Sequence, residues 1–450
     1  MLLKVTPIST FSGTFRIPSS KPETQRAILT ATLAEGTSRV FNDLRCDETE
    51  TMKKACRTIG GEIVEHDDHL EIHGIGRSPA YGNRIIDAAG SGLVFRTLAA
   101  LSSVSRSPVV ITGDATLCNR VMAPLLDTLR TLGADIQSIC KEGNAPIVNW
   151  GRPLRGGKCR LPGNVSSQFI TAILLAAPFA ERAVDIEITG EVYSKSYIRQ
   201  TLTSMARAGI SVAASDDYRH FHVEPSIYRP HDTYITEDYT SASYLLAAAA
   251  LFKGRSVFTN VHGSSEQGEI AIVDILKRLG LRLEFDHAGR SLTVENPHGT
   301  PRGDFEFNAA DFPNIVPTLA AIACYVDGTF RVVGGRITRF HKASRIEAMI
   351  SELSAAGVNI SALHDDGVCD GFEVRGASTY PGFRKFSSWG DHRIFMSLFV
   401  ASLRMQSPCF FSGFEDVRLS FPEFFSEFAK AGVATGVVDA MEVDERRAVA

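Results

Sequence analysis

Residues 166–175 read Ser-Ser-Gln-Phe-Ile-Thr-Ala-Ile-Leu-Leu, a polar start followed by an almost wholly apolar run. Serine readily caps a helix, and a helix that is apolar on every side must be buried. Residues 184–188 alternate apolar and acidic side chains, which is typical of a half-buried strand. A second predicted helix ends near Gly209, a residue type that commonly closes helices, and a hairpin is expected to turn at Asp216-Asp217.

The same order of polar cluster, apolar helix, β-branched strand, second helix and glycine occurs six times along the chain. The closing glycines lie about 71 to 77 residues apart, and a fixed spacing of this kind indicates repeated folding units. They are Gly60, Gly133, Gly209, Gly280, Gly357 and Gly432. The sequence therefore predicts an α/β (α+β) protein built from six repeats.

Two domains are predicted, because a chain of 450 residues is long enough to divide. Repeats one to three form the first domain, residues 15–230. Repeats four to six form the second, residues 231–450 together with 1–14. The joint is placed near residues 225–238, where Pro, His and Asp gather, and the first dozen or so residues are expected to return and pair with the second domain.

Composition argues against several classes of protein. A net charge of −4 does not support a general attraction to nucleic acid. Apolar stretches such as residues 244–252 are much shorter than the roughly 20 residues of a membrane helix. The eight cysteines are scattered without any Cys-x-x-Cys, and no signal peptide is apparent at the N-terminus. We therefore expect a cytoplasmic protein with reduced thiols, no metal site and no cofactor motif.

The polar clusters place chemistry-capable side chains at helix starts. Free backbone N–H groups and the helix dipole make such starts favourable for anions, so six converging starts would form an anion site. Four arginines fall at or near these starts, where a cation opposes the dipole; they are Arg96, Arg120, Arg345 and Arg393. Because Arg binds carboxylate and phosphate in a bidentate fashion, this placement favours a bound anion.

Plain structural roles remain open for the other clusters. Lys21 and Arg26 lie near one face of the first helix, either as anion ligands or as a solvated start set by Pro22. The Ser166-Ser167-Gln168 and Asp391-His392-Arg393 clusters are either helix caps or ligands.

The segment His66-Asp67-Asp68-His69 has two interpretations, a metal cluster or a turn. Similar residues stand at the same place in later repeats, just past the closing glycine; they are Asp216-Asp217, Asp286-His287 and His364-Asp365-Asp366. Repetition at a hairpin position favours turn residues, with the metal as the alternative.

Longer motifs occur in order along essentially the whole chain. The strongest is Pro153-Leu154-Arg155-Gly156-Gly157 with residues 161–169, Leu-Pro-Gly-Asn-Val-Ser-Ser-Gln-Phe. The others are Ser91-Gly92-Leu93-Val94-Phe95-Arg96, Gly190-Glu191-Val192-Tyr193-Ser194-Lys195, Ser241-Ala242-Ser243-Tyr244 and Gly390-Asp391-His392-Arg393. With them the chain resembles the enolpyruvyl transferases, most closely the 5-enolpyruvylshikimate-3-phosphate (EPSP) synthase branch. The branch that acts on a nucleotide sugar is a poorer match, because Cys118 lies only two residues before Arg120 and the cysteine-bearing loop of that branch is not evident.

The resemblance implies two domains of three βαβαββ repeats each, an inside-out α/β barrel that closes over phosphoenolpyruvate and a phosphorylated acceptor in the shikimate pathway. It implies phosphoenolpyruvate ligands at Lys21, Gly92, Arg120, Gln168, Arg345 and Arg393. It implies an acceptor-phosphate site at Ser166, Ser167 and Ser194, with Arg26 and Tyr197 nearby. The expected partners are these two small molecules, without nucleic acid or membrane, and the protein is expected to be a monomer.

Four positions depart from the family pattern. Asn314 stands where the family has the acidic residue that handles the acceptor hydroxyl, and Lys342 stands where it has a glutamate. Leu419 replaces a lysine, and Pro22 replaces a serine after the first lysine. The first three changes make the acceptor side of the site more electropositive.

Enolpyruvyl transfer adds a hydroxyl to phosphoenolpyruvate and then eliminates phosphate, so protons must be moved at the methylene carbon and at the hydroxyl. Asn cannot act as a base, whereas Lys can if burial or nearby cations lower its pKa. The candidate catalytic residues are Lys21, Asn314, Lys342 and His392. We expect Lys342 and Lys21 to handle protons, and an acceptor other than shikimate 3-phosphate that carries an extra anionic group.

Three readings of function follow. The first is an enolpyruvyl transferase with the usual or an altered acceptor. The second is a diverged relative that keeps the anion-binding residues but is non-catalytic or runs different chemistry. The third, an enzyme of nucleic-acid ends built from related repeats, fits worst with the charge of −4.

Overall fold

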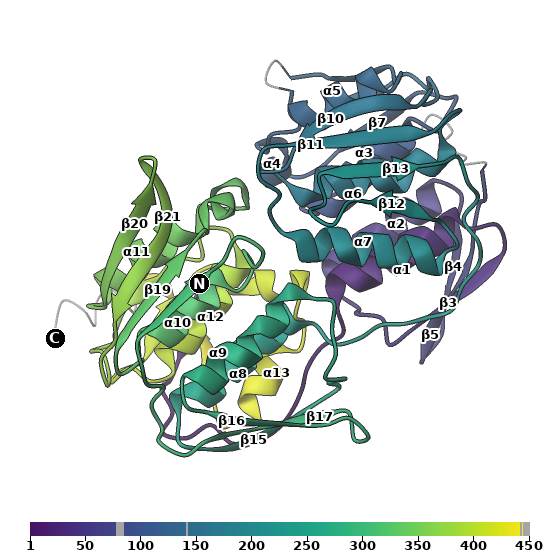
Figure 1. Ribbon diagram of the computed structural model, residues 1–450. Helices are drawn as coiled ribbons and strands as arrows, with labels where there is room; N and C mark the ends of the chain where they lie inside the picture. Colours follow the sequence, from purple (N-terminus) through teal and green to yellow (C-terminus); the bar gives the residue numbers. More distant parts are fainter. Residues whose placement is uncertain (78–84, 141–142, 442, 444–450) are drawn as a thin grey trace. The chain divides into compact units, whose positions relative to one another are not determined.

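The computed structural model describes residues 1–77, 85–140, 143–441 and 443. The chain forms two compact units (Figure 1). We call the one made of Ser19–Thr236 the inserted unit, and the one made of Met1–Pro18 and Glu237–Ala450 the terminal unit. The chain therefore passes between the units twice, and each unit contains three four-stranded sheets.

The sheets of the inserted unit contain one repeat each. In strand order the first is β14 (Thr233–Tyr234), β3 (Thr37–Phe41), β5 (His69–His73) and β4 (Glu62–Glu65). The second is β6 (Ile85–Asp87), β7 (Val109–Thr112), β9 (Ile147–Asn149) and β8 (Ile136–Ser138). The third is β10 (Gly157–Pro162), β11 (Val184–Thr189), β13 (His220–Val223) and β12 (Val212–Ala214).

The terminal unit has the same arrangement. Its first sheet is β2 (Gly13–Arg16), β15 (Gly254–Thr259), β17 (Ser291–Asn296) and β16 (Arg282–Asp286). The second is β18 (Phe305–Asn308), β19 (Thr329–Val333), β21 (Val368–Arg375) and β20 (Asn359–Asp365). The third is β22 (Lys385–Phe386), β23 (Cys409–Phe411), β1 (Leu2–Val5) and β24 (Thr435–Val438).

In all six sheets the first two strands are parallel and the other pairs are antiparallel. A parallel pair needs a crossover connection, and within a repeat that connection is a helix. The helices of the inserted unit are α1 (Lys21–Leu33), α2 (Asp47–Thr58), α3 (Gly92–Ser102), α4 (Ala115–Cys118), α5 (Ala123–Thr131), α6 (Ser167–Ala176), the 3₁₀ helix η1 (Ala177–Phe179) and α7 (Lys195–Arg207). Those of the terminal unit are α8 (Tyr239–Leu251), η2 (Gly268–Ile270), α9 (Ala271–Arg278), α10 (Val316–Ala323), η3 (Arg336–Phe340), α11 (Arg345–Ala355), α12 (His392–Ser402), η4 (Phe414–Leu419) and α13 (Phe424–Ala429).

Two first strands are exchanged between repeats. β2 precedes α1 in the chain but pairs with β15 of the fourth repeat, and β14 precedes α8 but pairs with β3 of the first. The strand β1 completes the sixth repeat by pairing with both β23 and β24. The return of the N-terminal residues to the later repeats is thus confirmed.

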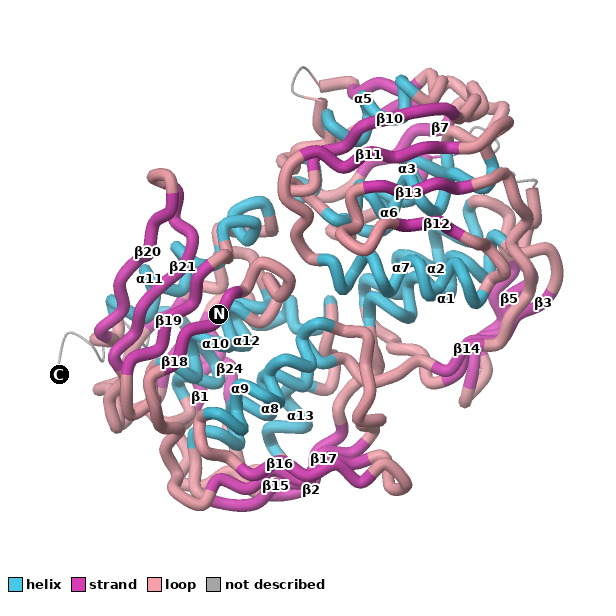
Figure 2. Tube along the Cα trace, viewed as in Figure 1, coloured by secondary structure: helices cyan, strands magenta, loops and turns pink. Residues whose placement is uncertain are grey.

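The first helix of each repeat forms the core of its unit. In the terminal unit every residue of α8, α10 and α12 is buried, and the three helices pack on one another. The sheets surround these helices and keep one face toward solvent, as the alternating burial of β17 shows (Figure 2). Helices that are apolar on every side are stable only in such a position.

The main sequence predictions about local structure are confirmed. The apolar run of the third repeat is α6, the alternating segment is β11, and the Asp216-Asp217 turn joins β12 to β13. All six closing glycines have positive φ, between 76° at Gly209 and 110° at Gly60, a region that other residues rarely adopt. None of the described helices combines the length and apolar character needed to cross a bilayer.

We expect Gly371→Ala to lower the free energy of unfolding by about 1–3 kcal/mol, the usual cost of overpacking. A Cβ at Gly371 in β21 would lie 1.8 Å from the Val332 carbonyl oxygen of β19, so the two strands would have to separate. Urea denaturation measures the change. The control is Gly436→Ala in β24, where an added Cβ meets nothing within 4 Å. Equal stabilities of the two variants would contradict the packing.

Candidate active site

Lys21 is held at the start of α1 in the inserted unit. Ser20 caps the helix by accepting a hydrogen bond of 3.3 Å from the N–H of Glu23. Lys21 Nζ lies 2.9 Å from a carboxylate oxygen of Glu48, which belongs to the first turn of α2. Gln25 then links neighbouring elements, since its Nε2 donates to the Glu48 carbonyl at 3.2 Å and to Ser91 Oγ at 3.3 Å. The buried Lys21 is therefore fixed beside α2 and near the start of α3.

Four of the helix-start residues converge at Gly92. A Cβ built on Gly92 would lie 2.8 Å from Arg96 Nη1, 2.9 Å from Arg120 Nη1 and 3.3 Å from Gln168 Oε1. Arg96 Nη1 also donates a short hydrogen bond to Gln168 Oε1. Three segments thus bring two guanidinium groups and one carboxamide to a point where the chain has no side chain.

Among the described residues, no carboxylate forms a salt bridge with Arg96. Arg96 is buried, and its guanidinium lies 5.2 Å from the centre of the Phe169 ring. Burial, and then the positive charge of Arg120, lower the pKa of Arg96 to about 9, so the group stays protonated at pH 7. A buried cation beside a second positive charge is costly, which favours an anion-binding role for Arg96.

The starts of α6 and α7 contain the three serines. Ser166 caps α6 by accepting from the N–H of Gln168 at 3.3 Å, and Ser167 is its first residue. Ser194 precedes α7 in the left-handed region, with φ of 57° and ψ of 43°. Such a conformation costs a non-glycine residue about 1–3 kcal/mol and is common at functional sites. The hydrogen bond from the N–H of Gln168 confirms the capping role that was predicted as an alternative for Ser166.

Arg26 serves as a brace between helices. Its Nε donates to Thr201 Oγ1 at 3.0 Å, Nη1 to the Pro22 carbonyl at 3.0 Å, and Nη2 to the Tyr197 carbonyl at 3.2 Å. Burial lowers the pKa of Arg26 to about 10. Two nitrogens of Arg26 thus join α1 to α7, and the third bonds to the first turn of α1 itself.

In the terminal unit the central feature is an ion pair between two helix starts. Arg345, the first residue of α11, donates through Nε to Asp391 Oδ2 at 2.8 Å. Asp391 caps α12, since its Oδ1 accepts from the N–H of Arg393 at 2.8 Å. Burial acts to raise the pKa of Asp391, but Arg345 and His392 outweigh it and hold that pKa far below the ordinary value.

Asp391 supplies a carboxylate for Arg345 within the chain, so the position of Arg345 at a helix start does not by itself point to a bound anion. The capping interpretation of Asp391 is confirmed at the same time.

Asn314 extends the ion pair. Its Oδ1 accepts from Arg345 Nη1 at 2.9 Å, and its Nδ2 donates to Glu269 Oε1 at 3.4 Å. Asp391, Arg345, Asn314 and Glu269 therefore form one chain of hydrogen bonds across α12, α11, the segment before α10, and η2.

The other candidates of this unit lie on the same helix starts. His392 and Arg393 are the first two residues of α12 and are buried, and Arg393 lies near the buried phenol of Tyr244. Burial raises the pKa of Tyr244 to about 12, although Arg393 and Arg345 act against it. Lys342 is half-buried in the loop before α11. Leu419 is half-buried at the end of η4.

Two participants were missed from the sequence, Gln25 and Glu269. Glutamate is common near the start of a helix because its negative charge interacts favourably with the helix dipole. Glu269 therefore gave no distinctive signal in the sequence. The burial of Glu269, with an exposed fraction of 1%, appears only once the fold is known.

The segment at His66 is the turn between β4 and β5, and the later Asp and His pairs also lie at hairpins. Ligand atoms of His66, His69 and Glu71 lie within 4.8 Å of one another. The pairing of β4 with β5 confirms the turn interpretation of this segment. Within the turn region, His69 Nδ1 lies 2.7 Å from Asp68 Oδ1.

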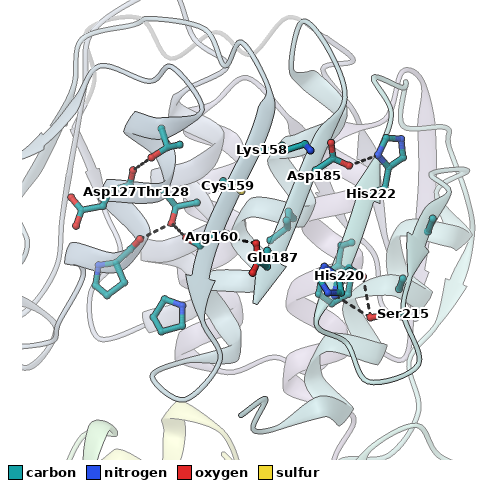
Figure 3. A pocket seen from close by; sticks show the side chains of 17 residues that line it. Asp127, Thr128, Lys158, Cys159, Arg160, Asp185, Glu187, Ser215, His220 and His222 are labelled. Atoms are coloured by element: carbon teal, nitrogen blue, oxygen red, sulfur yellow. Dashed lines mark hydrogen bonds and ion pairs between the residues drawn. The ribbon is translucent and has the colours of Figure 1, made fainter. Parts of the chain in front are cut away.

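A cavity of about 1120 Å³ lies against the solvent face of the third sheet, and none of the predicted site residues lines it (Figure 3). Its charged side chains are largely paired with one another. Arg160 lies 2.8 Å from Glu187, and His222 lies 2.7 Å from Asp185. Arg160 and His222 in this cavity therefore have carboxylate partners, and the cavity does not contain the arginines that gather at Gly92.

Comparisons with known proteins show to which family the chain belongs. Residues 5–428 match the model of the EPSP synthase (3-phosphoshikimate 1-carboxyvinyltransferase) family. A 3-phosphoshikimate 1-carboxyvinyltransferase of Halobacterium salinarum is 34% identical over 94% of this chain and 97% of its own. One from Methanosarcina acetivorans is 32% identical over 94% and 96%.

Solved structures show the same fold. EPSP synthase from Acinetobacter baumannii has a TM-score of 0.79 at 24% identity, covering 97% of this chain and all of that one. The enolpyruvyl transferase NikO from Streptomyces tendae has a TM-score of 0.74 at 16% identity, covering 97% and 98%. Fold and sequence together define a carboxyvinyl transferase. The chain belongs to the EPSP synthase family, which confirms the resemblance and the α/β fold of six repeats.

Asp391→Asn should lower the free energy of unfolding at pH 7 by about 3–5 kcal/mol, because it leaves the buried Arg345 cation without its carboxylate. The folded-state pKa of Asp391 is depressed, so its contribution is present above the unfolded pKa of about 3.9 and is lost as pH falls further. The difference from the native protein should thus shrink below about pH 4.

Urea denaturation between pH 3 and 8 measures this, with Asp366→Asn in the exposed β20–β21 turn as control. A difference that does not change with pH would show that the pair contributes no charge-dependent stability.

Proposed function

We propose that this protein transfers the enolpyruvyl (carboxyvinyl) group of phosphoenolpyruvate to a hydroxyl group of a phosphorylated acceptor. The observation that supports this most is the cluster at Gly92, where Arg96, Arg120 and Gln168 gather around a position without a side chain. Guanidinium groups at helix starts favour anions with several oxygens. Phosphoenolpyruvate carries both a phosphate and a carboxylate.

The proposed roles follow the positions on the helices. The proposed ligands of phosphoenolpyruvate are Lys21, Gly92, Arg120, Gln168, Arg345 and Arg393. The acceptor phosphate is bound by Ser166, Ser167 and Ser194, with Arg26 bracing α1 and α7 behind them and Tyr197 nearby. The proposed enzyme works as a cytoplasmic monomer on small molecules without a cofactor.

Two acceptors are supported by different observations. Shikimate 3-phosphate is favoured by the names of relatives at 34% and 32% identity. A different acceptor with an extra anionic group is favoured by Asn314 and Lys342, which place an amide and a cation where the family pattern has two acids. Because the serines of the phosphate site are retained, both acceptors are phosphorylated compounds.

Phosphate release from phosphoenolpyruvate and shikimate 3-phosphate separates the two acceptors. Release supports shikimate 3-phosphate. Absence of release, with phosphoenolpyruvate still bound by calorimetry, supports the altered acceptor. Loss of phosphoenolpyruvate binding as well would refute the transferase proposal and favour a diverged relative.

Lys342→Glu tests the altered acid/base position. If Lys342 moves protons, the variant should lose at least about 100-fold in kcat with the native acceptor, the usual weight of one acid or base. Lys385→Glu, at the exposed residue of β22, makes the same change of charge and should retain activity. Ordinary turnover of shikimate 3-phosphate by Lys342→Glu, with no loss of native activity, would refute the role.

Gly92→Ala should weaken phosphoenolpyruvate binding about tenfold or more while leaving stability nearly unchanged. The new Cβ meets only the ends of flexible arginine and glutamine side chains, which can move aside, but in moving they leave their binding positions. Calorimetry with phosphoenolpyruvate and thermal denaturation give the two quantities. Unchanged affinity would place the anion elsewhere.

A further inference from the structure

The hairpin that joins β4 to β5 gathers three side chains that can bind a metal ion. They are His66, His69 and Glu71, and one ligand atom from each lies within 4.8 Å of the other two. Two histidines and one glutamate form a ligand set that zinc uses in proteins, with the fourth position left open. The turn predicted from the sequence and this cluster of ligands therefore occur together in the same hairpin.

The register of the hairpin places the three side chains on one face of the sheet. Glu65 pairs with Leu70, and beyond this pair the N–H of His66 donates to the carbonyl of His69 at 2.9 Å. Residues opposite each other on antiparallel strands point to the same face, so His66 and His69 do so. Side chains alternate along a strand, which puts Glu71 on that face as well. It is the solvent face, because the intervening Leu70 is fully buried.

His69 is held and oriented by its neighbours. Its ring centre lies 5.3 Å from that of Phe41 on β3, and its Nδ1 lies 2.7 Å from Asp68 Oδ1. This hydrogen bond lowers the pKa of Asp68, so the carboxylate is ionised at pH 7 and can only accept. Nδ1 therefore carries the proton, and Nε2 keeps the lone pair that binds metal. A histidine ligand whose other nitrogen donates to a carboxylate is the usual arrangement at metal sites.

His66 has an anchored backbone and an exposed side chain. The preceding Glu65 is held by α2, because its carboxylate lies 2.8 Å from Nζ of the buried Lys53 and 3.0 Å from Nη2 of Arg57. The side chain of His66 is exposed to solvent. Exposed side chains change rotamer within picoseconds to nanoseconds, so the ring of His66 can turn while its backbone stays in place.

Binding requires a small adjustment of these side chains. Bonds from zinc to nitrogen and oxygen measure about 2.0–2.2 Å, so ligand atoms around a tetrahedral ion lie about 3.4 Å apart. The separation of up to 4.8 Å must therefore shrink by about 1.4 Å at most. The rings of His66 and His69 are stacked with their planes 15° apart, so the His66 ring must also rotate to aim its lone pair at the ion. Its exposure permits this rotation.

Glu71 makes long contacts with its neighbours. Its Oε2 lies 3.7 Å from Arg39 Nε, and its Oε1 lies 3.4 Å from His73 Nε2. Both separations exceed those of a strong charge-assisted hydrogen bond. The side chain of Arg39 is 52% exposed, and an ion pair with such exposure contributes little to stability. A metal ion can therefore take the carboxylate of Glu71 at small cost.

We propose that His66, His69 and Glu71 bind one transition-metal ion of the zinc class, while Asp68 orients His69. A water molecule completes the coordination at the fourth position. The ion links the end of β4 to β5 and so stabilises the hairpin. The site lies within the inserted unit and does not depend on the transferase function proposed above, so either proposal can fail alone.

The donor atoms determine which ions fit this site. Imidazole nitrogen suits Zn²⁺, Cu²⁺ and Ni²⁺, whereas Mg²⁺ and Ca²⁺ prefer sites made of oxygen atoms. The three residues offer two nitrogens and one carboxylate, without sulfur. Zn²⁺ is the ion to test, because it accepts this mixed set in tetrahedral geometry.

Calorimetry of the full protein with Zn²⁺, after removal of bound metal by a chelator, tests the site. The native protein should bind one equivalent that depends on both histidines. Asp68→Asn keeps an acceptor but loses the charge and should weaken binding about tenfold, since residues that orient a ligand contribute about 10- to 100-fold. His66→Ala and His69→Ala each remove a ligand and should weaken binding more, by at least about 100-fold.

His220→Ala is the matched control. His220 lies at the corresponding place in the third repeat, where it begins β13 just after the turn. The residue opposite it is Ser215, whose N–H donates to the His220 carbonyl at 3.0 Å, so a second histidine is missing there. This variant should bind Zn²⁺ as the native protein does. Mg²⁺ in place of Zn²⁺ should give no binding that depends on His69.

Thermal denaturation separates lost binding from lost folding. Glu71→Gln nearly preserves the shape of the side chain, so without metal its melting temperature should be close to that of the native protein. Added Zn²⁺ should raise the melting temperature of the native protein more than that of Glu71→Gln, because a ligand that binds the folded state stabilises it.

Two results would overturn the proposal. One is the absence of Zn²⁺ binding by the native protein into the millimolar range. The other is equal binding by the native protein and both histidine variants, which would place the ion elsewhere, for example on the exposed thiol of Cys140. Asp68→Asn with native affinity would refute the orienting role of Asp68.

Discussion

The salt bridge between Arg345 and Asp391 joins two helix starts that the repeat brings together inside the terminal unit. Its atoms are 2.8 Å apart, and the side chains are 5% and 0% exposed. A cation at a helix N-terminus opposes the dipole, and an isolated buried charge of either sign is costly. Each member makes the other tolerable, and the same guanidinium binds Asn314, whose amide in turn contacts Glu269. The geometry of the acid/base region therefore depends on this pair.

The arginines at the helix starts of the inserted unit are arranged differently. Arg96 and Arg120 lie together at Gly92, and among the described residues no carboxylate forms a salt bridge with Arg96. The terminal unit thus pairs Arg345 internally, whereas Arg96 of the inserted unit has no such salt bridge among the described residues, at the place where the glycine keeps space open. The helix starts of the same repeat thus form an internal ion pair in one unit and a cluster around a glycine in the other, and both take part in the proposed anion binding.

The repeat, the buried helices and the family could be predicted because each leaves a periodic or local signal, as with α6, β11 and the closing glycines. The exchange of β2 and β14 could not be predicted from the sequence, since both strands are short and their pairing depends on which sheet edge the chain reaches. Asp391 gave a capping signal but none for its partner 46 residues away in sequence. Glu269 gave none, because its burial beside Asn314 arises only from the packing of η2 on α8.

The central claim is that the family reaction is retained while the acid/base groups and the acceptor side have been rearranged. Mass spectrometry of phosphorylated cyclitols, sugars and nucleotides incubated with the native protein and phosphoenolpyruvate tests it most directly. The account predicts that at least one phosphorylated compound gains the mass of a single carboxyvinyl group, and that the gain requires phosphoenolpyruvate. No mass gain in any compound, with phosphoenolpyruvate bound normally, would contradict it.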